Sequence, residues 1–420
     1  MNICALATAQ GGAIAVIRVS GEDAISIVSS LSDKPIADAK GYTMHYRNLA
    51  GIDDVVLSVF RAPHSYTGEN SVEISCHASS YIINTILQTL ILHGCRQALP
   101  GEFTQRAYLN GKMDLSQAEA VAEVIASTNA ATHRIAMSQL RGNFSSELAT
   151  LRERLLHLTS LMELELDFSD HEELEFADRT ELRELSDAIL AHITRLADSF
   201  RLGNALKRGV PVAIIGAPNV GKSTLLNALL GEDKAIVSDI QGTTRDLIED
   251  TITLGDITFR FIDTAGIRHT DDRIELLGIE RSRQAASRAQ IIILMNEPGV
   301  DFPDVDLRDD QTVIRITNKT ADFQALHGIG LDALRQQLIS AVPQVSEDQF
   351  IVTNLRHYEA LERAKDSLQL VIDGMQVGIP NDLLAEDLRE TLAHLAEITG
   401  GQITTDEVLG NIFKNFCIGK

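Results

Sequence analysis

The sequence predicts a protein of the α/β plus α class. Short apolar runs separated by turn residues fill residues 1–110, as in a mixed α/β domain. Long helical patterns fill residues 115–200 and return in 346–417. Between them, in 208–343, strands alternate with helices, which indicates a mostly parallel sheet. The simplest architecture therefore inserts a second α/β domain into a helical domain that resumes afterwards.

Composition sets the broad class. The chain has 420 residues, 44% hydrophobic and 23% charged, which is typical of a folded protein of two to four domains. We find neither an apolar run of the ~18 residues that a membrane span needs nor a signal peptide at the start. The expected location is the cytoplasm, where thiols stay reduced. The cysteines fit no zinc spacing: Cys4, Cys76, Cys95 and Cys417.

The chain is strongly acidic, with a formal net charge of −22. A protein that grips nucleic acid by itself usually presents a basic face. The overall charge therefore argues against strong unaided binding to nucleic acid. A nucleic-acid role would need a partner that carries positive charge.

The first domain should contain strands in 11–21, 55–63 and 71–79, the last of which alternates apolar and polar positions. Residues 81–94 have helical spacing and end at a glycine. From Leu115 to Phe200 there is no proline, and one apolar stripe at three- and four-residue steps indicates the core of a helical bundle. The stripe comprises Leu148, Leu151, Leu155, Leu158 and Met162.

The inserted domain opens with a buried strand and closes with a helix. Two strands joined at Gly255–Asp256 should form a hairpin within 250–263. The other expected elements are strands in 211–216, 291–295 and 312–317 and helices in 223–231 and 331–342. Two further amphipathic helices, 357–375 and 384–400, belong to the second part of the helical domain.

A phosphate-binding loop follows the first strand of the inserted domain. Residues Gly216–Ser223, GAPNVGKS, match G-x-x-x-x-G-K-[ST] between a strand and a helix. The glycines let backbone N–H groups surround phosphate oxygens, and the helix adds the positive end of its dipole. Lys222 should reach the β- and γ-phosphates, and Ser223 should ligate magnesium. The alternative is a structural glycine loop.

Two later motifs fit the same site. Asp263 ends a strand in DTAG, where it can hold magnesium, and Gly266 can contact the γ-phosphate through its N–H. Between the two motifs lies Gly242-Thr-Thr-Arg-Asp246, in which a threonine can complete the magnesium shell when a γ-phosphate is present. The alternative for the second motif is an exposed polar loop with a capping role.

A base-reading loop is expected after the strand in 312–317. Asn318 and Lys319 begin N-K-x-D, in which the aspartate accepts hydrogen bonds from guanine. Here Ala321 occupies the aspartate position and Asp322 follows it. Either the loop is shifted by one residue so that Asp322 reads the base, or discrimination between bases is weakened. The non-functional alternative is that Asn318 and Lys319 belong to a simple surface turn.

Several motifs together resemble the MnmE (TrmE) family of tRNA modification GTPases. They are GAPNVGKS, DIQGTTRD, DTAGIR, PHSYTGEN, PGEFTQRAYLNGKMDLSQAEAVAE and the terminal CIGK. The resemblance extends over nearly the whole chain. It implies a tetrahydrofolate-binding and dimerisation domain (1–113), a helical domain in two parts (114–207 and 344–420) and an inserted Ras-like G domain (208–343).

The resemblance also implies an activity and partners. The family works as a homodimer with the flavoprotein MnmG (GidA), which supplies much of the tRNA contact. Together they add a carboxymethylaminomethyl or aminomethyl group to carbon 5 of the tRNA wobble uridine, using a 5-formyl- or methylene-tetrahydrofolate one-carbon unit. Glycine and ammonium both remain open as the amine source. Potassium drives pairing of the G domains.

Roles of G-domain residues follow from the motif match. Magnesium is assigned to Ser223 and Thr244, and potassium to Asn219, Ser238, Ile240 and Thr243. A potassium ion against the phosphates can stabilise transition-state charge as an arginine finger does. Catalysis is assigned to Lys222, Arg245 and Glu275, which orients the attacking water; by itself Glu275 would be a solvated helix charge. The further nucleotide-binding residues are Val220, Gly221, Thr224, Asp239, Gln241, Gly242, Asp263, Thr264, Ala265, Gly266, Asn318 and Lys319.

The folate site is assigned by the same match to Arg18, Glu73, Lys112 and Lys420. Arg18 and Lys112 suit an anionic glutamyl tail or pterin oxygens, and Glu73 suits pterin donors. Without the resemblance, Arg18 would be a surface charge. Cys417 is either a catalytic thiol or a packing residue.

The G domain departs from the family pattern by its short loops. Only residues 296–311 separate its last two strands, and the S-A-K segment that supports guanine is either missing or replaced by Gln324-Ala325-Leu326. We therefore expect weak nucleotide affinity and a weakened preference for guanine. Two other classes remain: a GTP-gated ribosome assembly factor and a folate-dependent aminomethyltransferase with an appended switch.

Overall fold

The computed structural model describes most of the chain: residues 1–9, 11–167, 179–231, 250–262, 284–343, 350–401, 409, 412–414, 416, 417 and 419. The chain divides into two compact units. The first comprises residues 1–126, 136–190 and 363–420, and the second residues 127–135 and 191–362. None of the helices in the described ranges is long and apolar enough to cross a membrane.

The first unit begins with a six-stranded sheet in the order β3-β4-β5-β2-β1-β6. Its neighbours are antiparallel except for β1 and β6, which are parallel. The strands are β1 (Asn2–Leu6), β2 (Ile14–Ser20), β3 (Thr43–Leu49), β4 (Asp53–Phe60), β5 (Ser71–His77) and β6 (Cys95–Gln97). The expected strands in 11–21, 55–63 and 71–79 are thus confirmed.

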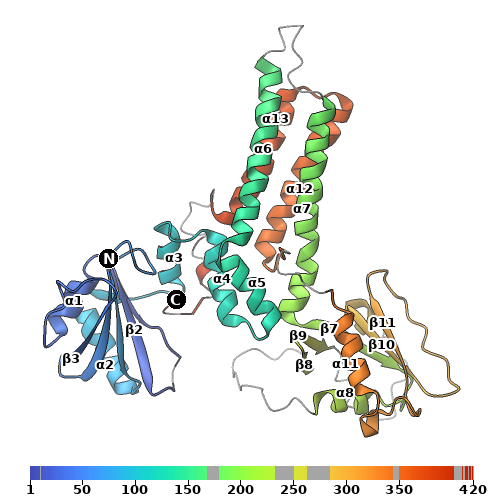
Figure 1. Cartoon of the computed structure of the whole chain (residues 1–420), viewed down its shortest axis with the longest axis horizontal. Helices are drawn as coiled ribbons and strands as arrows, with labels where there is room; N and C mark the ends of the chain where they lie inside the picture. Colours follow the sequence, from blue (N-terminus) through green and yellow to red (C-terminus); the bar gives the residue numbers. More distant parts are fainter. Residues whose placement is uncertain are drawn as a thin grey trace. The chain divides into compact units, whose positions relative to one another are not determined.

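Alternation along β2 gives the sheet two different faces. Ala15, Ile17 and Val19 are buried on the face that the two helices cover, where they belong to the main core of this sheet. Those helices are α1 (Ala24–Leu31) and α2 (Ser80–Leu92) (Figure 1). Arg18, one residue out of phase, points to the opposite face, toward helix α3 (Glu102–Leu109).

Long helices make up the rest of the first unit. Helix α6 (Asn143–Asp167) packs along α13 (Asn381–Thr399), as Figure 1 shows. The predicted leucine stripe of α6 is at most 3% exposed from Leu148 to Met162, so it is bundle core. Each such side chain stabilises the fold by about 1.5–3 kcal/mol through burial. The other helices that lie at least partly in this unit are α4 (Leu115–Ala126), α5 (Ala130–Leu140), α7 (Arg179–Arg208) and α12 (Leu355–Val377).

The second unit contains a five-stranded sheet in the order β11-β10-β7-β9-β8. All neighbours are parallel except β8 and β9, the predicted hairpin, whose turn is at Gly255–Asp256. The strands are β7 (Val210–Gly216), β8 (Asp250–Leu254), β9 (Ile257–Phe261), β10 (Ile291–Asn296) and β11 (Thr312–Thr317).

Apolar side chains cover both faces of this sheet. Helices α8 (Lys222–Leu230) and α11 (Leu331–Ser340) bury leucines against one face (Figure 1). On the other face, alanines of residues 284–289 and the partly buried Phe302 and Val305 pack on β7 and β10. Residues 297–311, which join the parallel strands β10 and β11, are all described and contain no helix. This short irregular connection therefore takes the covering position that a crossover helix usually fills.

Candidate functional site

The phosphate loop lies between β7 and α8, as its sequence predicted. A Cβ at Gly216 would lie 2.6 Å from the carbonyl oxygen of Met295, so the end of β7 tolerates no side chain. Asn219 (φ 62°) and Gly221 (φ 100°) both have left-handed backbones, which turn the chain back toward the helix. Val220 anchors the turn in the core at 2% exposure. The path of the loop is therefore set by the close contact at Gly216 and by two left-handed residues.

The start of α8 presents backbone donors to this loop. Leu225 N–H donates to Gly221 C=O at 2.9 Å, the first such bond of the helix. The N–H groups of Lys222, Ser223 and Thr224 precede that ladder and point out of the helix start, where an anion can accept them. Backbone donors and helix dipole therefore favour negative charge at this place.

Lys222 bends back over the loop. Its Nζ donates to the carbonyl oxygens of Gly216 (2.8 Å) and Ala217 (2.9 Å). Burial lowers the pKa of Lys222, because the half-buried ammonium loses part of its hydration. A bound phosphate would compensate for that loss, so the side chain is poised for an anionic ligand.

Asn318 joins the predicted base-reading loop to the phosphate loop. Its Nδ2 donates to Val220 C=O at 2.8 Å, and its Oδ1 accepts from Ala325 N–H at 3.1 Å. The side chain is 5% exposed. A Cβ at Gly221 would lie 2.5 Å from Asn318 Nδ2, which explains why glycine is needed there beyond its φ angle.

The residues after Asn318 form a tight turn. Thr320 N–H donates to Phe323 C=O at 3.1 Å, and Thr320 Oγ1 accepts from Phe323 N–H at 3.1 Å. Asp322 is exposed within that turn, while Lys319 (φ 62°) forms an ion pair with Glu297. The structure thus puts a carboxylate beside the loop, one position later than N-K-x-D would place it.

The segment expected at the S-A-K position is present. It forms the 3₁₀ helix η1 (Ala325–His327), whose first residue contacts Asn318 and which packs against α8. Gln324 and Ile329 close the segment with mutual backbone hydrogen bonds of 3.0 and 3.2 Å. Residues 324–327 thus lie against Asn318 and α8, and Gln324-Ala325-Leu326 as the replacement for S-A-K stays a prediction.

The other predicted site residues of the G domain, and the terminal lysine, lie outside the described residues. They are Ser238, Asp239, Ile240, Gln241, Gly242, Thr243, Thr244, Arg245, Asp263, Thr264, Ala265, Gly266, Glu275 and Lys420. Within the described ranges, no cluster of three or more His, Cys, Asp or Glu side chains could hold a metal ion. Ser223 lies in the first turn of α8, so a hydroxyl oxygen of the kind that ligates magnesium stands beside backbone N–H groups that can bind phosphate.

The predicted folate residues divide into two places. Arg18 and Glu73 are direct neighbours across β2 and β5, with Nη2–Oε1 at 2.7 Å. Arg18 Nη1 also donates to Gly419 C=O at 3.3 Å, which ties the chain terminus to this face. Lys112 instead contacts the loop after β4, where its Nζ donates to Pro63 C=O at 3.0 Å. Cys417 is exposed, and its carbonyl accepts from a backbone N–H at 3.4 Å.

Sequence reasoning missed the aromatic residues around Arg18. The guanidinium lies 5.3 Å from the ring centre of Tyr66 and 5.5 Å from that of Phe103. Burial raises the pKa of Tyr66, although its hydrogen bond with Thr104 and the charge of Arg18 oppose the shift. The PHSYTGEN motif could have pointed to Tyr66, but its spacing says nothing about contact with Arg18.

A buried ion-pair network supports the same face and was also missed. Glu102 accepts from Arg96 (2.5 and 2.7 Å), from Arg106 and from Leu99 N–H. Arg106 also pairs with Glu69 at 2.9 Å. Burial alone would raise the pKa of Glu102, but these hydrogen bonds outweigh it and lower the pKa. The network fixes helix α3 and the loop that carries Tyr66.

Comparisons with known proteins agree with these motifs. A family model described as "GTP-binding protein TrmE N-terminus" matches residues 2–112, and one described as "MnmE helical domain" matches residues 115–417. The chain is 54% identical to a Parabacteroides distasonis protein named tRNA modification GTPase MnmE, over 460 aligned positions that cover 100% of both chains. Proteins of the same name are 52% identical in Bacteroides fragilis and 48% identical in Flavobacterium psychrophilum, with 100% of this chain and 99% of each relative covered. The chain belongs to the MnmE (TrmE) family.

Proposed function

We propose that this chain is a GTPase of tRNA wobble-uridine modification, with GTP bound at the phosphate loop. The observation that carries the proposal is the cradle itself. Asn219 and Gly221 turn the loop through left-handed backbones, the first N–H groups of α8 precede its hydrogen-bond ladder, and Lys222 Nζ lies at the loop carbonyls. This arrangement suits the β- and γ-phosphates of a nucleotide, and the name shared by the relatives identifies the nucleotide as GTP.

The residues of the site would divide the work as follows. Lys222 and the backbone donors bind the phosphates. Ser223 and Thr244 hold magnesium, and Asn219, Ser238, Ile240 and Thr243 hold potassium. When bound, these cations supply charge stabilisation at the transferring phosphoryl group. Glu275 would position the attacking water, and Arg245 would take part in catalysis.

Base recognition differs from the usual N-K-x-D arrangement in our proposal. The side chain of Asn318 is hydrogen-bonded to Val220 and Ala325, so its role is to shape the loop. Recognition of the guanine edge then falls to Asp322. Because Asp322 is exposed in a tight turn, we expect low affinity and a reduced preference for guanine over adenine. Calorimetric titration with GDP and with ADP tests this; tight and fully selective GDP binding would reject it.

In this proposal the chain is divided into a first domain (1–113), a helical domain in two parts (114–207 and 344–420) and an inserted G domain (208–343). The first domain would dimerise and bind the one-carbon tetrahydrofolate at the Arg18–Glu73 face, with Lys112 and Lys420 contributing to the anionic tail. The partner is the flavoprotein MnmG, which brings the positive charge for tRNA that a chain of net charge −22 lacks. Paired G domains would hydrolyse GTP in a potassium-stimulated cycle. Cytoplasmic location follows from the tRNA substrate.

Three experiments test the proposal. In a deletion strain, mass spectrometry of tRNA should show wobble uridines that lack the aminomethyl-type group; unchanged modification together with a ribosome assembly defect would favour an assembly factor instead. Purified protein should hydrolyse GTP faster in potassium than in sodium at equal ionic strength, and equal rates would remove Asn219 from a potassium site. Turnover of folate and tRNA without the partner would instead favour a self-sufficient aminomethyltransferase.

A further inference from the structure

A polar cavity lies in the same unit as the phosphate loop, at the opposite end of the central strand β7. The cavity has a volume of about 290 Å³ and is lined by five arginines, with Pro211 and Gln290 among its other residues. We call it the arginine cavity; its arginines are Arg201, Arg208, Arg260, Arg288 and Arg308.

The arginine cavity is separate from the nucleotide site. Pro211 is the second residue of β7, and the phosphate loop leaves the last residue, Gly216. At about 3.3 Å per residue, five residues of strand separate the two places by roughly 16 Å. Arg260 faces Pro211 in the parallel pairing of β9 with β7, and Gln290 directly precedes β10. The cavity therefore belongs to the amino-terminal edge of the sheet.

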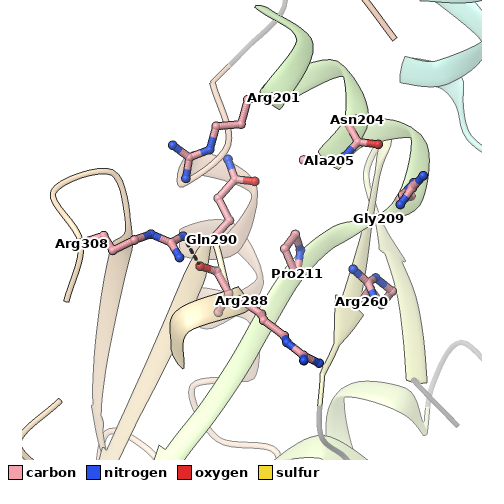
Figure 2. A pocket seen from close by; sticks show the side chains of 11 residues that line it. Arg201, Asn204, Ala205, Gly209, Pro211, Arg260, Arg288, Gln290 and Arg308 are labelled. Carbon is pink, nitrogen blue, oxygen red and sulfur yellow. Dashed lines mark hydrogen bonds between the residues drawn. The ribbon is translucent and has the colours of Figure 1, made fainter. Parts of the chain in front are cut away.

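The arginines come from separate parts of the second unit. Figure 2 shows Arg201 and Arg308 on one side of the cavity near Gln290, and Arg288 reaching toward Arg260 on the other. Arg201 belongs to the last turns of α7, and Arg308 to the connection between β10 and β11. Packing of the unit thus brings together charges that are far apart in the chain.

Part of this positive charge is neutralised. Arg201 forms an ion pair with Asp310, and Arg308 Nε contacts the same carboxylate at 3.0 Å. Arg308 also donates to the carbonyl oxygens of Ser287 and Ala289, the latter at 3.2 Å. These contacts hold Arg201 and Arg308 in place at the rim.

The side chains of Arg208 and Arg288 are different. Both are exposed, and neither forms an ion pair or a side-chain hydrogen bond with any residue in the part of the chain that the structure describes. Each stands at the end of a helical segment, where a cation favours the helix dipole. The helix dipole accounts for a single arginine at the end of each helical segment. It does not account for the gathering of Arg208 and Arg288 with three other arginines around one cavity.

We propose that the arginine cavity binds a phosphate group. Guanidinium groups pair with phosphate oxygens through two parallel hydrogen bonds, and several converging guanidiniums neutralise more than one negative charge. The volume lies just below the range of pockets for drug-sized ligands, so it suits a phosphate with its immediate substituent. The phosphate comes either from a small free anion or from the backbone of RNA. The site is additional to the proposed GTP site and does not depend on it.

The first test uses inorganic diphosphate as the probe. Calorimetric titrations are made on the full chain saturated with magnesium GDP and, separately, on a Lys222→Ala variant, so that the phosphate loop takes no part. The double variant Arg208→Gln/Arg288→Gln should bind diphosphate at least tenfold more weakly than its parent. A matched variant, Arg152→Gln/Arg183→Gln, removes two exposed arginines of the first unit and should bind like its parent. Unchanged thermal midpoints establish that each variant is folded.

The second test uses unmodified tRNA in filter-binding titrations at several salt concentrations. If RNA supplies the phosphate, the cavity variant should bind more weakly and its log–log salt slope should fall by up to about 2. Weaker diphosphate binding with unchanged RNA binding assigns the cavity to a small anion, and weaker RNA binding assigns it to the phosphodiester backbone. If the cavity variant and the matched variant bind both probes alike, the proposal is overturned.

Discussion

Asn318 donates its side-chain amide to the carbonyl oxygen of Val220 at 2.8 Å, which fastens the loop after β11 to the phosphate loop. The same side chain accepts from Ala325 N–H, so the phosphate loop, the loop after β11 and the start of η1 meet at one buried residue. The shape of the phosphate cradle therefore depends on a residue distant in sequence. We expect changes at Asn318 to affect nucleotide binding through loop geometry.

The first prediction concerns Asn318→Ala. The change leaves the Val220 carbonyl and the Ala325 N–H without this partner, and each unsatisfied buried group costs about 1–3 kcal/mol. The free energy of unfolding in urea should fall by that order, and GDP affinity should fall at least tenfold. Asn318→Asp keeps the acceptor for Ala325 N–H but aims a second oxygen at Val220 C=O, so it should be no more stable than Asn318→Ala. If Asn318→Ala bound GDP with wild-type affinity, the hydrogen bonds of Asn318 to Val220 and Ala325 would not be needed for nucleotide binding.

The second prediction concerns Gly221→Ala. Its Cβ would meet Asn318 Nδ2 at 2.5 Å on a backbone with φ 100°, so the loop has to move. GDP binding should be lost or reduced more than tenfold. Gly299→Ala is the matched control, since Gly299 has φ 82° but nothing within 4 Å of its Cβ. Gly299→Ala therefore has the conformational cost of about 1 kcal/mol for alanine at a positive φ, but its Cβ meets no other atom. Equal effects of the two changes on GDP binding would contradict the account.

The third prediction is a pH dependence from Lys222. Its pKa is lowered by burial in the nucleotide-free protein, so the unfolded chain holds this proton to higher pH. Stability of the nucleotide-free protein should therefore rise with pH between the lowered pKa and the ordinary value near 10.4. Phosphates favour the charged lysine, so GDP binding should take up protons in that window and weaken as pH rises. Calorimetry in buffers of different ionisation enthalpy measures the uptake.

Lys222→Arg is the control for this titration, because arginine stays charged throughout. The variant should show no proton uptake at this position. If wild type and Lys222→Arg bind GDP with the same proton balance, Lys222 is not the titrating group.

The fourth prediction concerns the buried carboxylate of Glu102, with its side chain 7% exposed between two arginines. Glu102→Gln should lower the free energy of unfolding by about 3 kcal/mol, since it removes the carboxylate that pairs with Arg96 and one of the two that pair with Arg106. Because the pKa of Glu102 is lowered in the fold, its stabilisation is complete above the ordinary pKa near 4.3 and is lost as pH falls through the folded value. Urea titrations across acid pH measure both effects.

Glu22→Gln is the comparison for Glu102, because Glu22 is exposed on the same unit. It should change stability by less than about 0.5 kcal/mol. A Glu102→Gln protein as stable as Glu22→Gln would mean that the network adds nothing to the fold.

Periodicity and local motifs predicted much of this fold. The leucine stripe from Leu148 to Met162, the turn at Gly255–Asp256 and the strand before Gly216 were all found where expected, because each is determined by neighbouring residues. The strands β1, β3 and β6 were not predicted. They are short or polar, and their pairing partners lie elsewhere in the chain.

The contacts between residues distant in sequence at these sites could not be predicted from the sequence either. Nothing near Asn318 indicates that its amide reaches Val220, and nothing near Arg18 indicates the rings of Tyr66 and Phe103. The arginine cavity has no sequence signature at all, because its arginines are spread from Arg201 to Arg308. Such contacts are determined by tertiary packing, and a local sequence pattern carries no information about them.

The most direct test of the central claim is the binding of a non-hydrolysable GTP analogue to the purified chain with magnesium and potassium. We predict saturable binding of one nucleotide per chain, abolished in Lys222→Ala and retained in Arg152→Gln. An absence of binding at millimolar analogue, in protein shown to be folded, would contradict the assignment of Gly216–Ser223 as a nucleotide site.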